Sequence, residues 1–169
     1  MTSEATAGPT ELRFSIAVAC PAQHAFQVFT QRFDAIKPRD HNLMANPIVE
    51  TVLDPFVGGT IRDIAEDGTV CVWARILVFE PPQRLAFSWD IGPTWEVETD
   101  PAHTSEVTVT FEPTGTDSTR VVLEHTHLER HLGPLEGFRG LSGGRGWPLY
   151  LDRFRALVSG LGDDATPGR

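Results

Sequence analysis

The 169-residue sequence lacks the features that mark several large classes of protein. No apolar run reaches the roughly 18 residues that a membrane-spanning helix needs. The first eleven residues have neither the basic stretch nor the apolar core of a secretory signal. We therefore expect a cytoplasmic protein that does not insert into a membrane.

Cysteine and positive charge are also scarce. The two cysteines, Cys20 and Cys71, are far apart, which argues against a disulfide framework and a zinc knuckle and favours two small, buried or half-buried thiols. Fourteen basic residues against 23 acidic ones give a net charge of −9, and Lys37 is the only lysine. Because nucleic-acid binders carry a basic surface, we expect no nucleic-acid partner.

The apolar residues that are present suffice for one domain. At 40% hydrophobic residues, a chain of this length can build a single core. Both ends are small and polar or rich in glycine, aspartate and proline, as tails often are. We expect a folded domain over residues 11–161, flanked by tails at 1–10 and 162–169.

Hydrophobic periodicity predicts the elements of that domain. Leu12 to Val18 alternate as a half-buried strand does, and the apolar residues after Pro21 recur at helical spacing, predicting a helix over 21–33. Short β-like runs between turn residues then predict six further strands, in a mainly antiparallel sheet. They span residues 48–53, 59–65, 70–79, 84–91, 104–112 and 118–126.

The last predicted element is a strongly amphipathic helix. Its apolar stripe runs through Trp147, Leu151, Phe154, Val158 and Leu161, and Gly143, Gly144 and Gly146 precede it as a flexible lid. The order of elements favours an α+β helix-grip fold, in which a curved antiparallel sheet of about seven strands wraps around a long C-terminal helix. A gap between sheet and helix would form a pocket.

Six short segments carry a family resemblance in their order and spacing. They are Ala25 to Thr30, Pro55 to Gly59, Val78 to Trp89, Ser105 to Val109, Thr119 to His125, and Gly146-Trp147. Together they resemble the bacterial single-domain type of the family named after the activator of the Hsp90 ATPase, within the START-like (SRPBCC) superfamily. The resemblance implies the helix-grip fold. It also implies that the Ile36–Asn42 loop borders the pocket mouth, where close relatives often carry a tryptophan pair instead.

Three histidines are the main candidates for metal binding or acid–base catalysis. His125 and His127 end a predicted strand and His131 follows, so a metal site or a general base can be considered. No zinc-protease motif or facial carboxylate pattern accompanies them, and we predict no metal and no cofactor. His125 shares its strand face with Val121 and Leu123, so we expect it to face the cavity and keep it as the candidate catalytic residue.

For other polar and aromatic residues, the sequence leaves both a functional role and a packing role open. Asp63, Glu96 and Glu98 would act as acids or bases only if they are buried, and acidic residues are mostly solvated. The four tryptophans suit either a pocket wall or the core. For Trp73 and Trp95, partial exposure is an equal alternative.

The leading functional hypothesis is a binding protein for a small hydrophobic ligand, lipid-like or aromatic. The expected ligand-binding residues are Phe87, Trp89, Val109, Phe111, Leu123, His125, Trp147, Leu151 and Phe154.

The second hypothesis is a polyketide cyclase or dehydratase type of enzyme that uses the same pocket. This hypothesis requires a buried titratable group among His125, Asp63 and Glu96. The third, implied by the family name, is a stimulator of a chaperone ATPase, although eukaryotic activators carry an additional N-terminal domain. A chaperone or a second copy of the chain would then be the protein partner.

Overall fold

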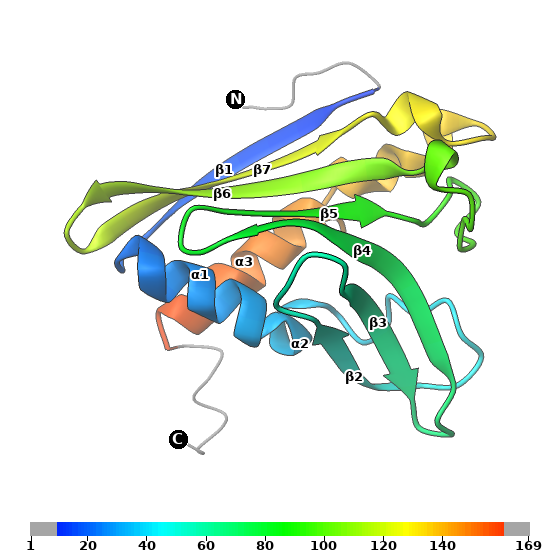
Figure 1. Cartoon of the computed structure of the whole chain (residues 1–169), viewed down its shortest axis with the longest axis horizontal. Helices are drawn as coiled ribbons and strands as arrows, with labels where there is room; N and C mark the ends of the chain where they lie inside the picture. Colours follow the sequence, from blue (N-terminus) through cyan, green and yellow to red (C-terminus); the bar gives the residue numbers. More distant parts are fainter. Residues whose placement is uncertain (1–9, 161–169) are drawn as a thin grey trace.

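An antiparallel sheet folded around one helix forms the frame of the protein (Figure 1). The computed structural model describes residues 10–160. The predictions for Leu161 and for most of the two tails lie outside these residues. No helix within the described range is long and apolar enough to cross a membrane.

The described residues form seven strands in one sheet, with the order β1-β7-β6-β5-β4-β3-β2. The N-terminal strand therefore pairs with the last one, and Leu12 lies opposite His125. The strands are β1 (Leu12–Val18), β2 (Ile48–Leu53), β3 (Thr60–Ala65), β4 (Val70–Glu80), β5 (Arg84–Trp89), β6 (Ser105–Gly115) and β7 (Ser118–Thr126). Every neighbouring pair is antiparallel.

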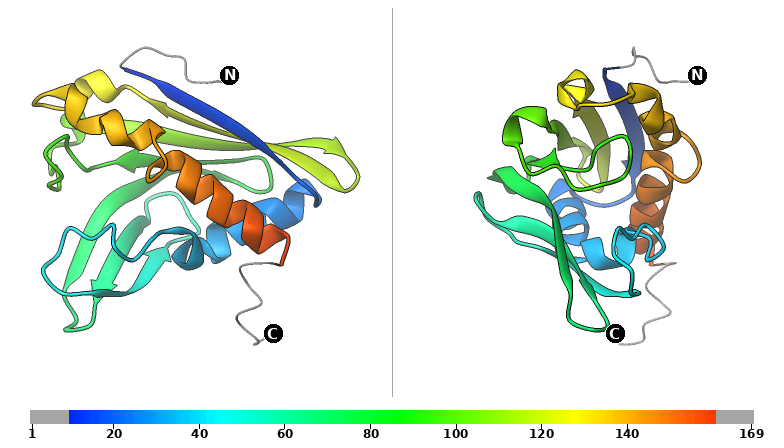
Figure 2. Two further views of the ribbon diagram at one scale, coloured as in Figure 1. Left: turned by 180° about the vertical axis from the view of Figure 1, so that it is seen from behind. Right: turned by 90° about the vertical axis from the view of Figure 1, so that its right-hand side faces the viewer.

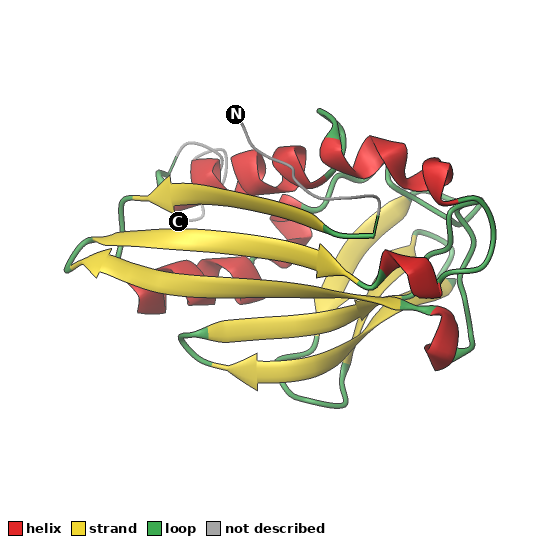
Figure 3. Cartoon of the chain, turned by 90° about the horizontal axis from the view of Figure 1, so that it is seen from above, coloured by secondary structure: helices red, strands yellow, loops and turns green. Residues whose placement is uncertain are grey.

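Helices occupy the concave side and one end of the sheet. They are α1 (Ala22–Gln31), α2 (Phe33–Ile36) and α3 (Trp147–Val158), with the short 3₁₀ helices η1 (Pro101–His103), η2 (Leu128–Arg130) and η3 (Leu135–Ser142). Figure 2 shows α3 lying diagonally across the sheet, which curls round it. Figure 3 shows short helical turns and several connecting loops gathered at one end of the sheet. The helix-grip prediction is confirmed.

The strand predicted over 104–112 extends to Gly115, and two other predicted elements are interrupted or shorter. The helix predicted over 21–33 is broken at Arg32, whose φ of −114° and ψ of 24° interrupt the helical backbone. The break lets Phe29 of α1 and Phe33 of α2 both pack into the core, with ring centroids 5.7 Å apart. The strand predicted over 84–91 ends at Trp89, because Ile91 leaves the ladder and forms an isolated bridge with Val97 across a tight turn.

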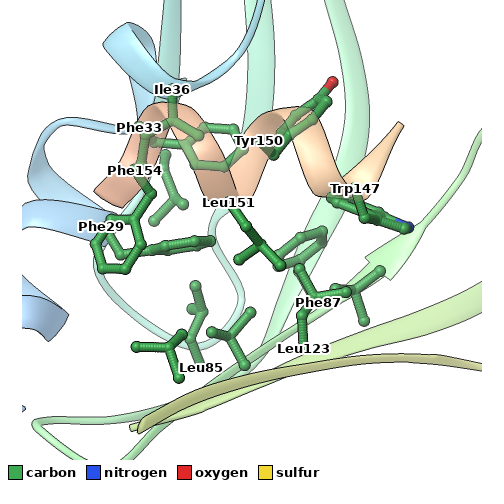
Figure 4. Close-up of a cluster of buried hydrophobic side chains, with 14 of the residues drawn as sticks. Phe29, Phe33, Ile36, Leu85, Phe87, Leu123, Trp147, Tyr150, Leu151 and Phe154 are labelled. Carbon is green, nitrogen blue, oxygen red and sulfur yellow. The ribbon is translucent and has the colours of Figure 1, made fainter. Parts of the chain in front are cut away.

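The space under α3 is filled. Phe154 and Leu151 point from the helix toward the sheet, where Phe87 and Leu123 meet them, and each of these side chains is at most 2% exposed (Figure 4). Such packing leaves no room for a ligand along the middle of the helix. A cavity between α3 and the sheet must therefore lie toward one end of the helix.

The start of α3 is fixed by the segment before it. Pro148 in the first turn suits a helix start, because a helix needs no N–H there. Gly146 lies so close to the preceding turn that a Cβ atom would meet the carbonyl oxygen of Leu141 at 2.1 Å. Only glycine fits, and this contact holds Trp147 at the first position of the helix.

Candidate functional site

A pocket of about 410 Å³ opens at the N-terminal end of α3. This volume lies within the usual range for small-molecule sites. Its walls come from the loop between α2 and β2, from strands β3 to β5, from the β5–β6 loop, and from the segment that leads into α3. The lining residues are Lys37, Asp40, His41, Asn42, Leu43, Asp63, Trp73, Trp89, Ile91, Trp95, Gly140, Leu141, Arg145, Gly146, Trp147 and Tyr150.

All four tryptophans of the sequence line this pocket. The ring of Trp89 packs edge-on against Trp73 and Trp147, with centroids 5.7 and 5.3 Å away, and Trp147 lies 5.1 Å from Tyr150. Trp73 is only 1% exposed, whereas Trp95 is 46% exposed. Of the two residues for which partial exposure was an alternative, Trp95 is therefore exposed and Trp73 is buried.

Two of these indoles have an unsatisfied polar atom. Within residues 10–160, neither the Trp73 nor the Trp89 Nε1–H has a hydrogen-bond acceptor, although both nitrogens are buried. Buried donors in folded proteins are nearly always paired. Two unpaired donors in one pocket wall therefore call for an explanation.

A buried ion pair forms another part of the wall. The Lys37 ammonium lies 3.1 Å from the Asp63 carboxylate, and both side chains are less than 5% exposed. Thr51 donates a hydrogen bond of 2.7 Å to the other carboxylate oxygen, and the ammonium also donates to the backbone carbonyl of His41. Burial lowers the pKa of Lys37, while Asp63 acts in the opposite direction.

His41 and Tyr150 form a second polar pair. Their Nδ1 and hydroxyl oxygen are 3.0 Å apart. Burial lowers the pKa of His41 and raises the pKa of the Tyr150 hydroxyl, so both groups are neutral near pH 7. In Figure 4 the hydroxyl of Tyr150 points away from the hydrophobic cluster. A neutral imidazole and a phenol at hydrogen-bond distance can move a proton to or from a bound molecule.

Behind the aromatic wall, a chain of hydrogen bonds holds Trp147. Its Nε1–H donates to His125 Nδ1 at 3.0 Å, so the remaining proton of the neutral imidazole is on Nε2. His125 Nε2 then donates to the Ser105 hydroxyl at 2.8 Å, and Ser105 in turn donates to His131 Nε2 at 2.8 Å. Complete burial lowers the pKa of His125 to about 3, which keeps this direction of donation fixed.

An exposed ion pair ties the rim of the pocket together. Arg145, in the segment before α3, donates to the Asp40 carboxylate at 2.8 Å, and this bond lowers the pKa of Asp40. The two residues lie 105 positions apart in the sequence. Asp40 belongs to the Ile36–Asn42 loop, which therefore borders the pocket mouth as the family resemblance implies.

The nine predicted ligand-binding residues fall into two groups. Trp89 and Trp147 line the pocket. The other seven are buried in the core below it or behind its wall: Phe87, Val109, Phe111, Leu123, His125, Leu151 and Phe154. The assignment of all nine to a ligand site stays a prediction, and so does a catalytic role for His125.

Sequence reasoning missed several polar residues of the pocket, namely Lys37, His41 and Tyr150. The available signals were weak: Lys37 is the only lysine, Tyr150 is the only tyrosine, and the loop of Lys37 and His41 was expected at the mouth of the pocket.

Among the acids and bases that the enzyme hypothesis requires, His125 and Asp63 are buried and Glu96 is exposed.

The three histidines near the end of β7 separate. His125 and His131 converge on Ser105, whereas His127 is exposed and lies 3.6 Å from Glu129. In the described part of the chain, no group of three or more histidine, cysteine, aspartate or glutamate side chains is placed to hold a metal ion.

Comparisons with known proteins place the chain among proteins of the same architecture. Residues 19–159 match the model of a family described as activator of Hsp90 ATPase homolog 1-like protein. No curated protein matches the chain.

Several solved structures are similar. The anthrahydroquino-γ-pyrone synthase Txn09, solved as a complex with a compound abbreviated SUM, is 36% identical over 90% of this chain and 99% of its own, with a TM-score of 0.61. The self-sacrificing resistance protein CalC from Micromonospora echinospora is 27% identical over 93% of this chain and 96% of its own, also with a TM-score of 0.61. Protein MLL2253 from Mesorhizobium loti is 21% identical over 88% and 96% of the two chains, with a TM-score of 0.60, and supports the fold alone.

Proposed function

The chain belongs to the family of activator of Hsp90 ATPase homolog 1-like proteins, and we propose that it binds a planar aromatic small molecule in the pocket at the start of α3. The observation that carries this proposal is the convergence of all four tryptophans on one pocket. Indole rings offer large flat surfaces that stack on other aromatic rings, edge-on or offset. The preferred ligand is therefore flat and ringed.

The filled core favours an aromatic ligand over a lipid. A fatty acyl chain needs a long, narrow tunnel, and the natural place for one is the space between α3 and the sheet. That space is occupied by Phe87, Leu123 and Phe154, each at most 2% exposed. The pocket of about 410 Å³ at the start of α3 has aromatic walls.

One relative supports the same class of ligand. The similar protein Txn09 is, by its name, a synthase of an anthrahydroquinone fused to a γ-pyrone, which is a planar aromatic ring system. It is 36% identical to this chain over nearly its whole length. At this similarity we expect a shared class of ligand but not the same ligand.

Two probes with the same head group test the binding proposal. Anthracene-2-sulfonate is flat and aromatic, whereas octane-1-sulfonate is aliphatic, and quenching of tryptophan fluorescence reports their binding. We expect saturable quenching by the anthracene probe and none by the octane probe at equal concentration. Native mass spectrometry of the purified protein would then identify any molecule that accompanies it. Equal binding of both probes, or of neither, contradicts the proposal.

A second candidate function is ring closure on such a ligand by acid–base catalysis. The observation that favours it is the neutral His41–Tyr150 pair in the pocket wall, 3.0 Å apart. In the closure of a 2-hydroxyaryl 1,3-diketone, His41 would take the phenol proton while the phenol oxygen attacks the distal carbonyl carbon. Tyr150 would protonate the carbonyl oxygen, and loss of water would complete the γ-pyrone.

The conversion of 1-(2-hydroxyphenyl)-1,3-butanedione to 2-methylchromone and water, followed by absorbance, tests this candidate. We expect acceleration by the protein and a loss of about 10²-fold or more in Tyr150→Phe and His41→Gln, as for other general acids and bases. His24→Gln, on the exposed face of α1, is the control and should keep full activity. No acceleration over buffer would reject catalysis of this closure and leave the binding proposal standing.

A further inference from the structure

We infer that Lys37, Trp73 and Trp89 form a donor cluster that receives a carbonyl oxygen of the ligand, so that the ligand is a planar aromatic ketone or quinone. This inference rests on the proposed function, because it describes how the same pocket recognises its aromatic ligand. It adds a chemical class that the aromatic walls alone do not specify.

The two indoles supply the first part of the argument. An indole nitrogen can only donate a hydrogen bond, and burial without an acceptor removes the bond it would make to water. Trp73 and Trp89 are 1% and 5% exposed, and their N–H groups have no acceptor among residues 10–160. Both side chains line the pocket, and their rings are in contact at 5.7 Å. An oxygen atom of a bound molecule would provide the missing acceptor.

Lys37 supplies the second part. An ammonium group has three N–H donors. Two of them are accounted for by the Asp63 carboxylate and the backbone carbonyl of His41, and residues 10–160 offer no oxygen or nitrogen acceptor for the third. The ammonium lies 5.8 Å from the centre of the Trp73 ring, so the cation and this indole belong to one cluster.

Three acceptor side chains of the pocket already have hydrogen-bond partners. Asp63 accepts from Lys37 and Thr51, and Asp40 accepts from Arg145. The side-chain carbonyl of Asn42 accepts from the backbone of Met44. The buried side-chain atoms of the wall that have no partner within residues 10–160 are the Trp73 and Trp89 N–H donors. A ligand rich in carbonyl oxygens complements this wall better than a hydrocarbon of the same shape.

The position of the ammonium is also fixed before any ligand arrives. The bond from Thr51 holds the Asp63 carboxylate at 2.7 Å, and that carboxylate holds Lys37. A donor that is already oriented loses little side-chain freedom on binding. The donor cluster is therefore preorganised for an oxygen atom.

A matched pair of probes tests the inference. Anthraquinone-2-sulfonate and anthracene-2-sulfonate share their ring outline and charge and differ in two carbonyl oxygens. We expect the wild-type protein to bind the quinone about tenfold more tightly, as one or two good hydrogen bonds would give. The readout is the ratio of the two dissociation constants. A loss of packing that weakens the binding of both probes equally leaves this ratio unchanged.

Three variants of the full chain remove the donors. Trp73→Phe and Trp89→Phe keep a ring but lose the N–H, and the double variant Lys37→Met/Asp63→Asn removes the ammonium without leaving an unpaired buried carboxylate. We expect each of the three to lower the quinone preference. Phe56→Leu, whose side chain is 54% exposed and does not line the pocket, is the control and should keep the wild-type ratio.

The outcomes separate this inference from the proposed function. Equal wild-type affinity for the two probes overturns the donor cluster and leaves aromatic binding intact. A wild-type preference that survives in all three variants also overturns it, because other groups would then bind the oxygen. If neither probe binds, the proposed function fails and the inference fails with it.

Discussion

At the scale of single residues, the buried Lys37–Asp63 pair sets the chemistry of the pocket wall. Each charge is less than 5% exposed, and each has the other as its counter-ion. Removal of one partner of a buried pair typically costs about 3–5 kcal/mol, because the other charge stays buried without compensation. Each partner of the pair therefore contributes to the stability of the fold, in addition to the proposed role of Lys37 in binding.

Lys37→Met should lower the free energy of unfolding by about 3–5 kcal/mol, whereas Lys37→Met/Asp63→Asn should lower it by clearly less. Urea denaturation followed by circular dichroism gives both values. Equal losses in the two variants would mean that Asp63 does not depend on Lys37.

His125 makes stability depend on pH in a defined direction. Its pKa is about 3 in the folded protein, because of complete burial, and near 6.5 in an unfolded chain. Between these values only the unfolded chain takes up the proton, so the free energy of unfolding rises with pH across this window. The contribution is complete above about pH 6.5 and amounts to at most about 5 kcal/mol.

We therefore expect His125→Gln to flatten the fall in unfolding free energy between pH 6.5 and pH 4, measured by urea titrations at each pH. His127→Asn is the matched control, since His127 is exposed and has a left-handed backbone (φ 64°) that asparagine tolerates. Parallel curves for the wild type and His125→Gln would contradict this assignment.

At the scale of elements, the segment before α3 positions the aromatic wall. Gly146→Ala should destabilise the protein by about 2 kcal/mol or more, because the new Cβ atom would meet the Leu141 carbonyl oxygen at 2.1 Å. Gly144→Ala is the control in the same loop, where a Cβ atom would meet nothing within 4 Å. The change in melting temperature measures both. A Gly146→Ala melting temperature equal to that of Gly144→Ala would show that the contact is not needed.

Elements were predictable where periodicity is strong. The alternation of Leu12 to Val18 and the apolar stripe from Trp147 to Val158 both gave the observed strand and helix, because burial on one face leaves a pattern in the sequence. The break at Arg32 left no such pattern, since apolar residues continue at helical spacing on both sides of it. Local backbone geometry there follows from packing of Phe29 and Phe33.

At the scale of the whole molecule, the fold was predictable and the pocket only in part. Trp89 and Trp147 were expected in its wall because they lie on a strand and a helix that face each other. Lys37, His41 and Tyr150 come together only when a loop after α2 folds against the start of α3, and no local pattern encodes that meeting. Phe87 and Phe154 are buried in the core below the pocket, and their role at a ligand stays a prediction, because periodicity does not distinguish a filled interior from a hollow one.

The central claim, that the four tryptophans surround an aromatic ligand, has a direct spectroscopic test. A ¹H–¹⁵N correlation spectrum of the labelled protein contains one side-chain indole N–H signal per tryptophan, and the sequence has four. Signals are assigned with the single Trp→Phe variants, and anthraquinone-2-sulfonate is then titrated in. We predict saturable shifts of all four, largest for Trp73 and Trp89, whose N–H groups gain an acceptor, and smaller for Trp147, which already donates to His125. Four signals that stay in place through the titration would contradict the account.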